Sequence, residues 1–300
     1  MYLYRKLALL ENLPENKELN ALINLLDEPD DIAFGVILEK IYTFGTEAIP
    51  ALEHSWENSF NLLVQERIEN IIRKIQQDNL QFEFSNWVGF GSSDLLKGFI
   101  LVSKTQYPDL NEENLIIQVE QIKMDIWLEL NDNMTALENV KVLNHVFFGV
   151  QRFDGNKINP ATPQNFYLNT LLETKKGSPL TLGILYMILA RKLNIPVYGV
   201  NLPQHFILAY LPGTDIEEPS DADVLFYINP FNKGAIFTRR EIELFVRQLR
   251  IQADSSFFTP CTNIDIISRL ISGLIFSYRQ LGYPEKIEEL ENLLGIIEAG

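Results

Sequence analysis

The sequence predicts an α+β protein that is mostly helical and has one small antiparallel sheet in its second half. Three observations support this prediction. Apolar residues recur at helical spacing at both ends of the chain, a nearly unbroken apolar run occupies residues 180–193, and short runs rich in β-branched and aromatic residues follow at 197–201, 206–210 and 224–228. The long run predicts a buried helix, and the short runs have the length and composition of strands. We therefore expect a core in which one buried helix leads into a small sheet.

Composition and charge limit the class of protein. The 300 residues include 46% hydrophobic and 22% charged side chains, which is typical of a globular chain. The formal net charge of -15 argues against a nucleic-acid partner, because phosphate binding requires clustered lysine and arginine. No apolar run reaches the roughly 18 residues that span a bilayer, and the run at 7–10 is too short for a signal peptide. We expect a soluble cytoplasmic protein without a membrane partner.

Cysteine and histidine usage indicates that no cofactor is bound. Cys261 is the only cysteine, which rules out an internal disulfide and a cysteine-based zinc site. The three histidines, His54, His145 and His205, are far apart and show no metal-ligand spacing. Neither a phosphate-binding P-loop nor a G-x-G-x-x-G fingerprint occurs. We therefore expect no metal, nucleotide or flavin.

Residues 1–80 are predicted to form a helical region. Pro29 ends one helix, and the acidic residues around it suit the start of the next. Helix pairs with an Ile-Pro-x-Leu step at 49–52 resemble a HEAT-type repeat. One or two such units are too few for a free-standing solenoid, so we expect a helical cap rather than a peptide-binding array. The aromatic, glycine-containing stretch 79–93 that follows is expected to be a packed connector.

The middle of the chain is predicted to contribute three helices and a polar loop. The helices are expected at 94–105, 111–130 and 135–150, and in the last of them His145 is expected to be a core residue because its neighbours are apolar. The loop at 154–165 ends at Asn165. We expect it either to line a cleft or to cover the core, with its asparagines satisfying buried backbone groups.

The C-terminal region is predicted to be an antiparallel helix pair. A capping box at Thr238 starts a helix that runs to 249, and helices at 263–281 and 285–297 flank the turn around Gly282. This pair resembles a tetratricopeptide unit, and a single pair is a cap or docking element. We expect three regions: helical residues 1–80, a core at 81–250 and a helical hairpin at 251–300.

Four side chains in the central stretch are candidates for a catalytic site. Ser178 and Thr181 lie at the start of the buried helix, and His205 and Asn229 lie at strand ends. A nucleophile at a helix start, a base and an orienting residue are the parts of a papain-like or transglutaminase-like site. Ser178 before Pro179 is also what a helix start requires, with serine as the N-cap and proline in the first turn. We favour capping over catalysis for Ser178.

Ordered motifs from 144 to 236 resemble the SirB-type transglutaminase-like family. They include Leu143-Asn144, Gly155-Asn156, Tyr167-Leu168-Asn169, Lys176-Gly177-x-Pro179-Leu180, Pro203-x-His205-Phe206 and Asn229-Pro230-Phe231-Asn232. They cover about a third of the chain. The helical regions on either side also resemble versions of this family. The resemblance implies a papain-like α+β core, and part of the family is named after a proposed regulator of bacterial invasion genes.

The resemblance also implies where catalytic residues would lie. The cysteine of active members falls on or beside Pro179, which has no nucleophile. His205 coincides with the family histidine, and Asn229 stands where the acid would be. Asparagine can accept a ring proton from histidine but cannot stabilise an imidazolium ion by charge. Cys261 lies outside the motif, and we do not expect it to act.

Our first functional hypothesis is a non-catalytic protein that binds a protein or peptide, possibly in a regulatory role. Its recognition cleft is expected to contain Asn165, Ser178, Asn201, Gln204, His205 and Asn229. The alternative is a hydrolase or acyltransferase that uses Ser178 or Thr181 with His205 and Asn229. A third hypothesis is a docking adaptor in which the helical ends carry the function.

Overall fold

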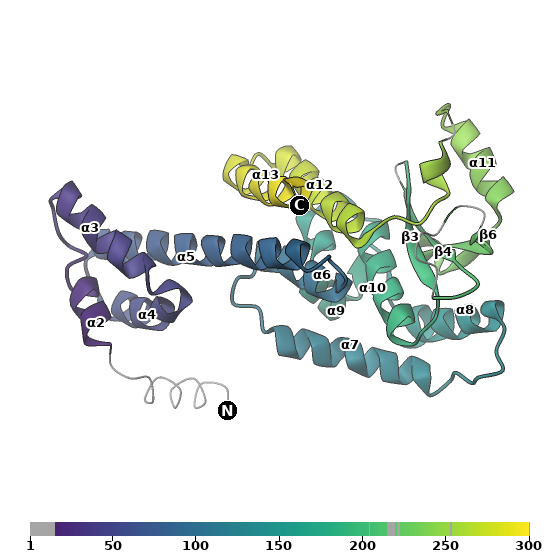
Figure 1. The fold of residues 1–300 in the computed structure, drawn as a ribbon, viewed down its shortest axis with the longest axis horizontal. Coiled ribbons are helices and arrows are strands. Elements are labelled where there is room, and N and C mark those ends of the chain that lie inside the picture. Colours follow the sequence, from purple (N-terminus) through teal and green to yellow (C-terminus); the bar gives the residue numbers. More distant parts are fainter. Residues whose placement is uncertain (1–15, 204, 215–219, 221–222, 253, 300) are drawn as a thin grey trace. The chain divides into compact units, whose positions relative to one another are not determined.

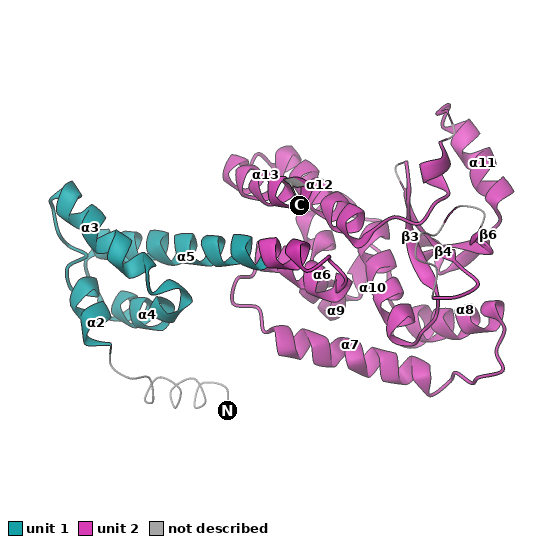
Figure 2. Ribbon diagram, viewed as in Figure 1, with its two compact units in different colours: residues 1–83 teal, residues 84–300 magenta. Residues whose placement is uncertain are grey.

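The protein is described here by a computed structural model, which covers residues 16–203, 205–214, 220, 223–252 and 254–299. The chain divides into two compact units, residues 1–83 and 84–300 (Figures 1 and 2). Among the residues that the structure describes, helices make up most of both units, and the strands lie in the second. The predicted α+β class is therefore confirmed.

The first unit is a helical bundle with its own core. It contains α2 (Lys17–Ile23), α3 (Asp31–Tyr42), η1 (Gly45–Ala48), α4 (Ile49–Asn58) and most of α5 (Leu62–Gly89). Asp30 caps α3 by accepting from the amides of Ile32 and Ala33, both at 2.9 Å. The apolar faces meet in one cluster that includes Leu26, Ile41, Leu52 and Ile68.

The predicted connector at 79–93 was wrong, because α5 continues to Gly89. Leu80, Phe84 and Trp87 are buried at spacings of four and three residues, which is one face of a helix. Two of the aromatic residues that suggested a packed connector, Phe84 and Trp87, are therefore on the inward side of a long helix, whereas Phe82 and Phe90 are exposed. Glycine occurs only at its end.

The second unit surrounds a helix that is buried on all sides. Helix α10 (Pro179–Lys192) has eleven consecutive buried residues from Leu180 to Ala190, as expected for a helix that is apolar all round. Four helices pack around it: α6 (Leu95–Lys104), α7 (Glu112–Trp127), α9 (Leu168–Thr174) and α12 (Asn263–Leu281). The last residue of α8 (Ala136–Asn144) accepts a hydrogen bond from Tyr186 of α10, and α13 (Pro284–Ala299) packs against α12. The predicted helix at 135–150 is present, with an α-helical part that ends at Asn144 and continues as a π-helix, η2 (His145–Val150). The prediction that His145 is a core residue was wrong, because its side chain is exposed on the outer side of this helix.

The sheet that follows α10 has the strand order β3-β4-β5-β6 and is antiparallel throughout. Its strands are β3 (Val197–Leu202), β4 (His205–Tyr210), β5 (Phe226–Asn229) and β6 (Ala235–Phe237). A separate parallel pair joins β1 (Asp154–Gly155) to β2 (Lys176–Gly177). The predicted small antiparallel sheet is therefore present, and β3 and β4 form its longest ladder.

The two faces of the sheet pack against different helices (Figure 1). On one face Phe206 lies against α10, where a Cβ added at Gly183 would be 2.6 Å from the Phe206 ring. On the other face α11 (Arg239–Gln248) contributes Ile242 and Val246 to a cluster with Ile207 and other strand residues. Because neighbouring strand residues face opposite sides, His205 begins β4 on the face that carries α11.

Candidate functional site

The first turn of α10 holds Ser178 and Thr181 in a capping box. The Thr181 amide donates to Ser178 Oγ at 3.1 Å, and the Ser178 amide donates to Thr181 Oγ1 at 3.0 Å. Thr181 Oγ1 also donates to the carbonyl of Asn165 at 2.9 Å. Both side chains are buried, with exposed fractions of 7% and 0%. The two hydroxyls are therefore engaged in holding the helix start, and Pro179 occupies its first position.

Asn165 belongs to the same buried network. It lies in η3 (Pro163–Phe166), and its Nδ2 donates to the carbonyls of Asn159 at 2.7 Å and Pro160 at 3.1 Å. Its Oδ1 accepts from Asn156 Nδ2 at 2.9 Å. Only 3% of the residue is exposed. Of the two predicted roles for this polar loop, its contacts are those of a covering loop that satisfies buried groups.

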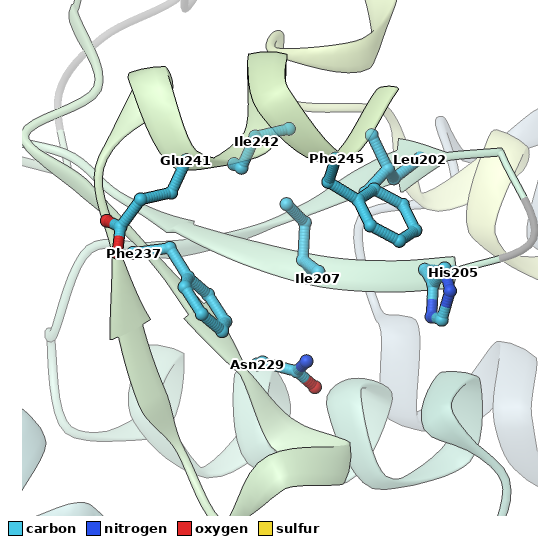
Figure 3. Close-up of a pocket in the computed structure, with 8 residues that line it drawn as sticks. All are labelled: Leu202, His205, Ile207, Asn229, Phe237, Glu241, Ile242 and Phe245. Carbon is cyan, nitrogen blue, oxygen red and sulfur yellow. The ribbon is translucent and has the colours of Figure 1, made fainter. Parts of the chain in front are cut away.

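His205 lies in a different place, in a pocket between the sheet and α11 (Figure 3). The pocket has a volume of about 180 Å³. Its lining is mostly apolar and consists of Leu202, His205, Ile207, Asn229, Phe237, Glu241, Ile242 and Phe245. The rings of His205 and Phe245 meet edge to face with centroids 4.9 Å apart. His205, Asn229, Phe237 and Phe245 are each half-buried, so the pocket opens to solvent.

The environment of His205 favours its neutral form. Burial lowers the pKa of the imidazole below its ordinary value, and the nearby positive charge of Arg269 lowers it further. Neither ring nitrogen forms a hydrogen bond with another residue of the described part of the chain. The ring is thus a neutral wall of the pocket with one donor and one acceptor available.

Asn229 shares the pocket with His205 but directs its oxygen elsewhere. Asn229 Oδ1 accepts from the amides of Phe231 at 3.0 Å and Asn232 at 3.2 Å, and so caps η5 (Pro230–Asn232). The structure therefore brings His205 and Asn229 to one cavity without a hydrogen bond between them. It does not bring Ser178 or Thr181 there, because neither lines the pocket.

Arg269 on α12 holds the β3–β4 hairpin at the base of His205. Its guanidinium donates to Asn201 Oδ1 at 2.9 Å, to the Leu202 carbonyl at 3.1 Å and to the His205 carbonyl at 2.8 Å. Asn201 therefore lies in this brace and not in the pocket lining. Gln204, the remaining predicted cleft residue, lies outside the described residues.

Cys261 is poorly suited to act as a nucleophile. Its Sγ donates to the Gly199 carbonyl at 3.2 Å, and burial raises the pKa of the thiol to about 12. Nucleophilic attack requires the thiolate, which is scarce at neutral pH for such a group.

Several residues that line or support the pocket were not predicted from the sequence. Phe237 and Phe245 lie 32 and 40 residues after His205, and Arg269 lies 64 residues after it. For Phe245 a signal existed, since it is on the apolar face of the capped helix that begins after Thr238. For Arg269 no local pattern distinguishes a brace from an ordinary surface arginine.

The fold and the motifs around His205 are those of a known class of protein. The model of the transglutaminase-like superfamily matches residues 113–272, more than half of the chain, and the protein belongs to that superfamily. It is 25% identical over 183 residues to F-box only protein 21 of Pongo abelii, covering 60% of this chain and 27% of that protein. It is also 32% identical over 164 residues to a UPF0162 protein of Pasteurella multocida, covering 55% and 56% of the two chains.

A UPF0162 protein of Xylella fastidiosa strain 9a5c is 27% identical over 153 residues, which is 51% of each chain. The chain thus spans about half the length of these bacterial relatives and about a quarter of the F-box relative. No solved structure shows a significant match. Among the described residues, no helix is long and apolar enough to cross a membrane, and no cluster of three potential metal ligands occurs.

Proposed function

We propose that this protein is a non-catalytic member of the transglutaminase-like superfamily that binds a protein or peptide through the His205 pocket. The observation that supports the proposal is that none of the three candidate nucleophiles, Ser178, Thr181 and Cys261, lines the His205 pocket. Ser178 and Thr181 are buried in the capping box, and the Cys261 thiol is bonded to a backbone carbonyl. A histidine base without an alcohol or thiol in reach cannot start covalent acyl transfer.

The pocket itself is suited to binding an apolar side chain. An apolar cavity of about 150 Å³ is large enough to hold benzene, and the His205 pocket has a volume of about 180 Å³. Phe237, Phe245 and Ile207 supply apolar walls, while the His205 ring and the amide of Asn229 supply polar groups at the rim. Pockets of this composition fix one anchoring side chain and orient it through a few polar contacts.

The helical regions support a more detailed assignment within the superfamily. We place the chain in its SirB-type branch, with HEAT-like helices at 1–80 and a tetratricopeptide-like hairpin at 251–300. The short helices α3 and α4, which follow each other around the Ile49–Pro50 step and share one apolar cluster, and the packed pair α12–α13 support this view. In this arrangement the C-terminal hairpin acts as a cap on the core of the second unit.

Selection of random twelve-residue peptides displayed on phage tests the proposed function. The full chain should enrich a set of peptides, and His205→Ala or Phe245→Ala should weaken their binding about tenfold, or ~1.4 kcal/mol. His145→Ala is the matched control, because His145 is an exposed histidine outside the pocket. Absence of any enriched peptide, or binding that the pocket variants leave unchanged, would overturn the proposal.

A covalent probe tests the catalytic alternative. A serine-directed fluorophosphonate should not label the protein, because both hydroxyls at the start of α10 are buried and hydrogen-bonded. Labelling that Ser178→Ala or Thr181→Ala abolishes would instead establish the hydrolase or acyltransferase hypothesis.

A further inference from the structure

Helix α11 is a ridge between two hollows. On one side Glu241, Ile242 and Phe245 line the His205 pocket. On the other side Arg239, Glu243 and Arg247 line a more polar cavity of about 330 Å³. At 100° per residue, Arg240 and Leu244 fall on the outward stripe between these hollows, and Arg247 lies at the edge of that stripe, where it also lines the polar cavity with Glu243 and Asp254. All three are exposed, Leu244 by 50%.

The charge of this segment is opposite to that of the rest of the molecule. Residues 233–250 contain five basic and two acidic side chains, a net of +3, whereas the whole chain carries -15. A local positive surface on an acidic protein attracts anionic partners and repels basic ones. The charge pattern therefore selects an acidic ligand for this side of the molecule.

The outward arginines differ from the other cations on the helix. Arg239 pairs with Glu243 at 3.2 Å and lies over the Phe258 ring at 4.6 Å. Arg240 and Arg247 form no ion pair within the described part of the chain. They lie four residues before and three residues after Leu244, so one side of the helix presents an apolar residue between two guanidinium groups.

We propose that this arginine face (Arg240, Leu244 and Arg247) and the adjoining His205 pocket together bind an acidic peptide segment of a partner protein. One aromatic or aliphatic side chain of the segment enters the pocket past Glu241 and Phe245. Its carboxylates pair with Arg240 and Arg247, since guanidinium groups bind carboxylates through two parallel hydrogen bonds. This inference rests on the proposed function and adds the chemistry of the partner.

Glu241 limits where the acidic residues of the bound peptide can lie. Hydrogen bonds from the backbone and side chain of Thr238 hold the pKa of Glu241 below its ordinary value, so a carboxylate stands at the pocket mouth. Acidic residues of the ligand are repelled from that point and attracted to the outward stripe. We expect the acidic residues of the peptide to lie over the arginine face. We do not expect one directly beside the apolar anchor, where it would meet Glu241 at the mouth of the pocket.

The same phage library provides the test, using the full chain as bait. Peptides enriched by the wild type should be acidic and contain a large apolar residue. Synthetic fluorescein-labelled copies should bind at least about tenfold more weakly to the double variant Arg240→Glu, Arg247→Glu, and the affinity should fall as salt rises from 50 to 150 mM. The double variant Arg73→Glu, Lys141→Glu makes the same charge change at two exposed positions outside the arginine face and the pocket lining, and it should bind normally.

The outcomes separate this inference from the function on which it rests. Neutral or basic peptides that depend on His205 but not on the arginines would overturn the acidic partner and leave peptide binding intact. No enriched peptide at all would overturn both. A twenty-nucleotide single-stranded DNA or phosphatidylserine vesicles bound as tightly as the acidic peptides, with the same dependence on Arg240 and Arg247, would overturn the assignment to a peptide.

Discussion

Ser178 and Thr181 show how a single turn of helix can imitate a catalytic motif. The spacing of two hydroxyls near a helix start is common to a nucleophile site and to a capping box, and the sequence favoured the cap. In the structure each hydroxyl has partners in the first turn of α10, and Thr181 reaches the Asn165 carbonyl as well. The contacts of Ser178 and Thr181 therefore stabilise the start of α10.

Thr181→Val is therefore expected to destabilise the protein by about 1–3 kcal/mol, because the buried Asn165 carbonyl and the Ser178 amide lose a partner. Thr181→Ser keeps the hydroxyl and should cost less. Urea unfolding followed by circular dichroism measures both. A Thr181→Val protein as stable as the wild type would contradict the structural role.

A pH titration of stability tests the environment of His205. Its pKa is lower in the folded state than in the unfolded chain, so the unfolded state binds more protons at acidic pH. The stabilising effect of the neutral ring is present above the ordinary histidine pKa of about 6.5 and is lost as the pH falls below it. His205→Gln should flatten the dependence of the unfolding free energy on pH below 6.5, whereas His145→Gln should leave the contribution of His205 intact. Equal slopes for His205→Gln and the wild type would show that the ring is not perturbed by folding.

At the scale of elements, close packing between α10 and the sheet is the feature most sensitive to added volume. Gly183→Ala would place a methyl group 2.6 Å from the Phe206 ring, and we expect a loss of about 1–3 kcal/mol. Gly295 on α13 is a matched helical control, because a Cβ there meets nothing within 4 Å. Gly295→Ala should be neutral or stabilising by about 0.5–1 kcal/mol. Chemical denaturation of both variants, and of Gly183→Ala with Phe206→Leu to relieve the crowding, checks the explanation.

Most of the elements of the core were within reach of the sequence because their signals are local. The apolar run of α10, its Ser-Pro start and the short β-rich runs each occupy fewer than fifteen residues. The composition of the pocket was not within reach. Phe237, Phe245 and Arg269 join His205 only after the hairpins close and α12 folds back, and these are contacts across 32 to 64 residues. Asn165 was assigned to the cleft because polar loops are ambiguous, and only its hydrogen bonds reveal that it is a buried residue.

At the scale of the whole molecule, the two compact units have separate apolar cores. The cluster around Ile41, Leu52 and Ile68 is made of residues 19–75 alone, and the cluster around Val200 and Ile207 belongs entirely to the second unit. Domains with their own cores are able to lose structure independently.

Ile41→Ala should therefore act locally. Ile41 is fully buried, and the substitution is expected to cost about 2–5 kcal/mol. Hydrogen exchange should become faster in α2 to α4 and remain unchanged in α10 and α12. Faster exchange throughout both units would show that they unfold as one cooperative body.

The brace that Arg269 forms has a thermodynamic consequence. It joins α12 to the hairpin that carries His205 through three hydrogen bonds. A ligand that changes the position of that hairpin must also change the free energy of α12, and linkage is reciprocal for binding equilibria. A partner that binds the C-terminal helices would then change the affinity of the pocket for its ligand. By the same factor, a ligand in the pocket would change the affinity of the helices for that partner. Binding to the C-terminal helices would thus change the ligand affinity of the pocket without direct contact with it.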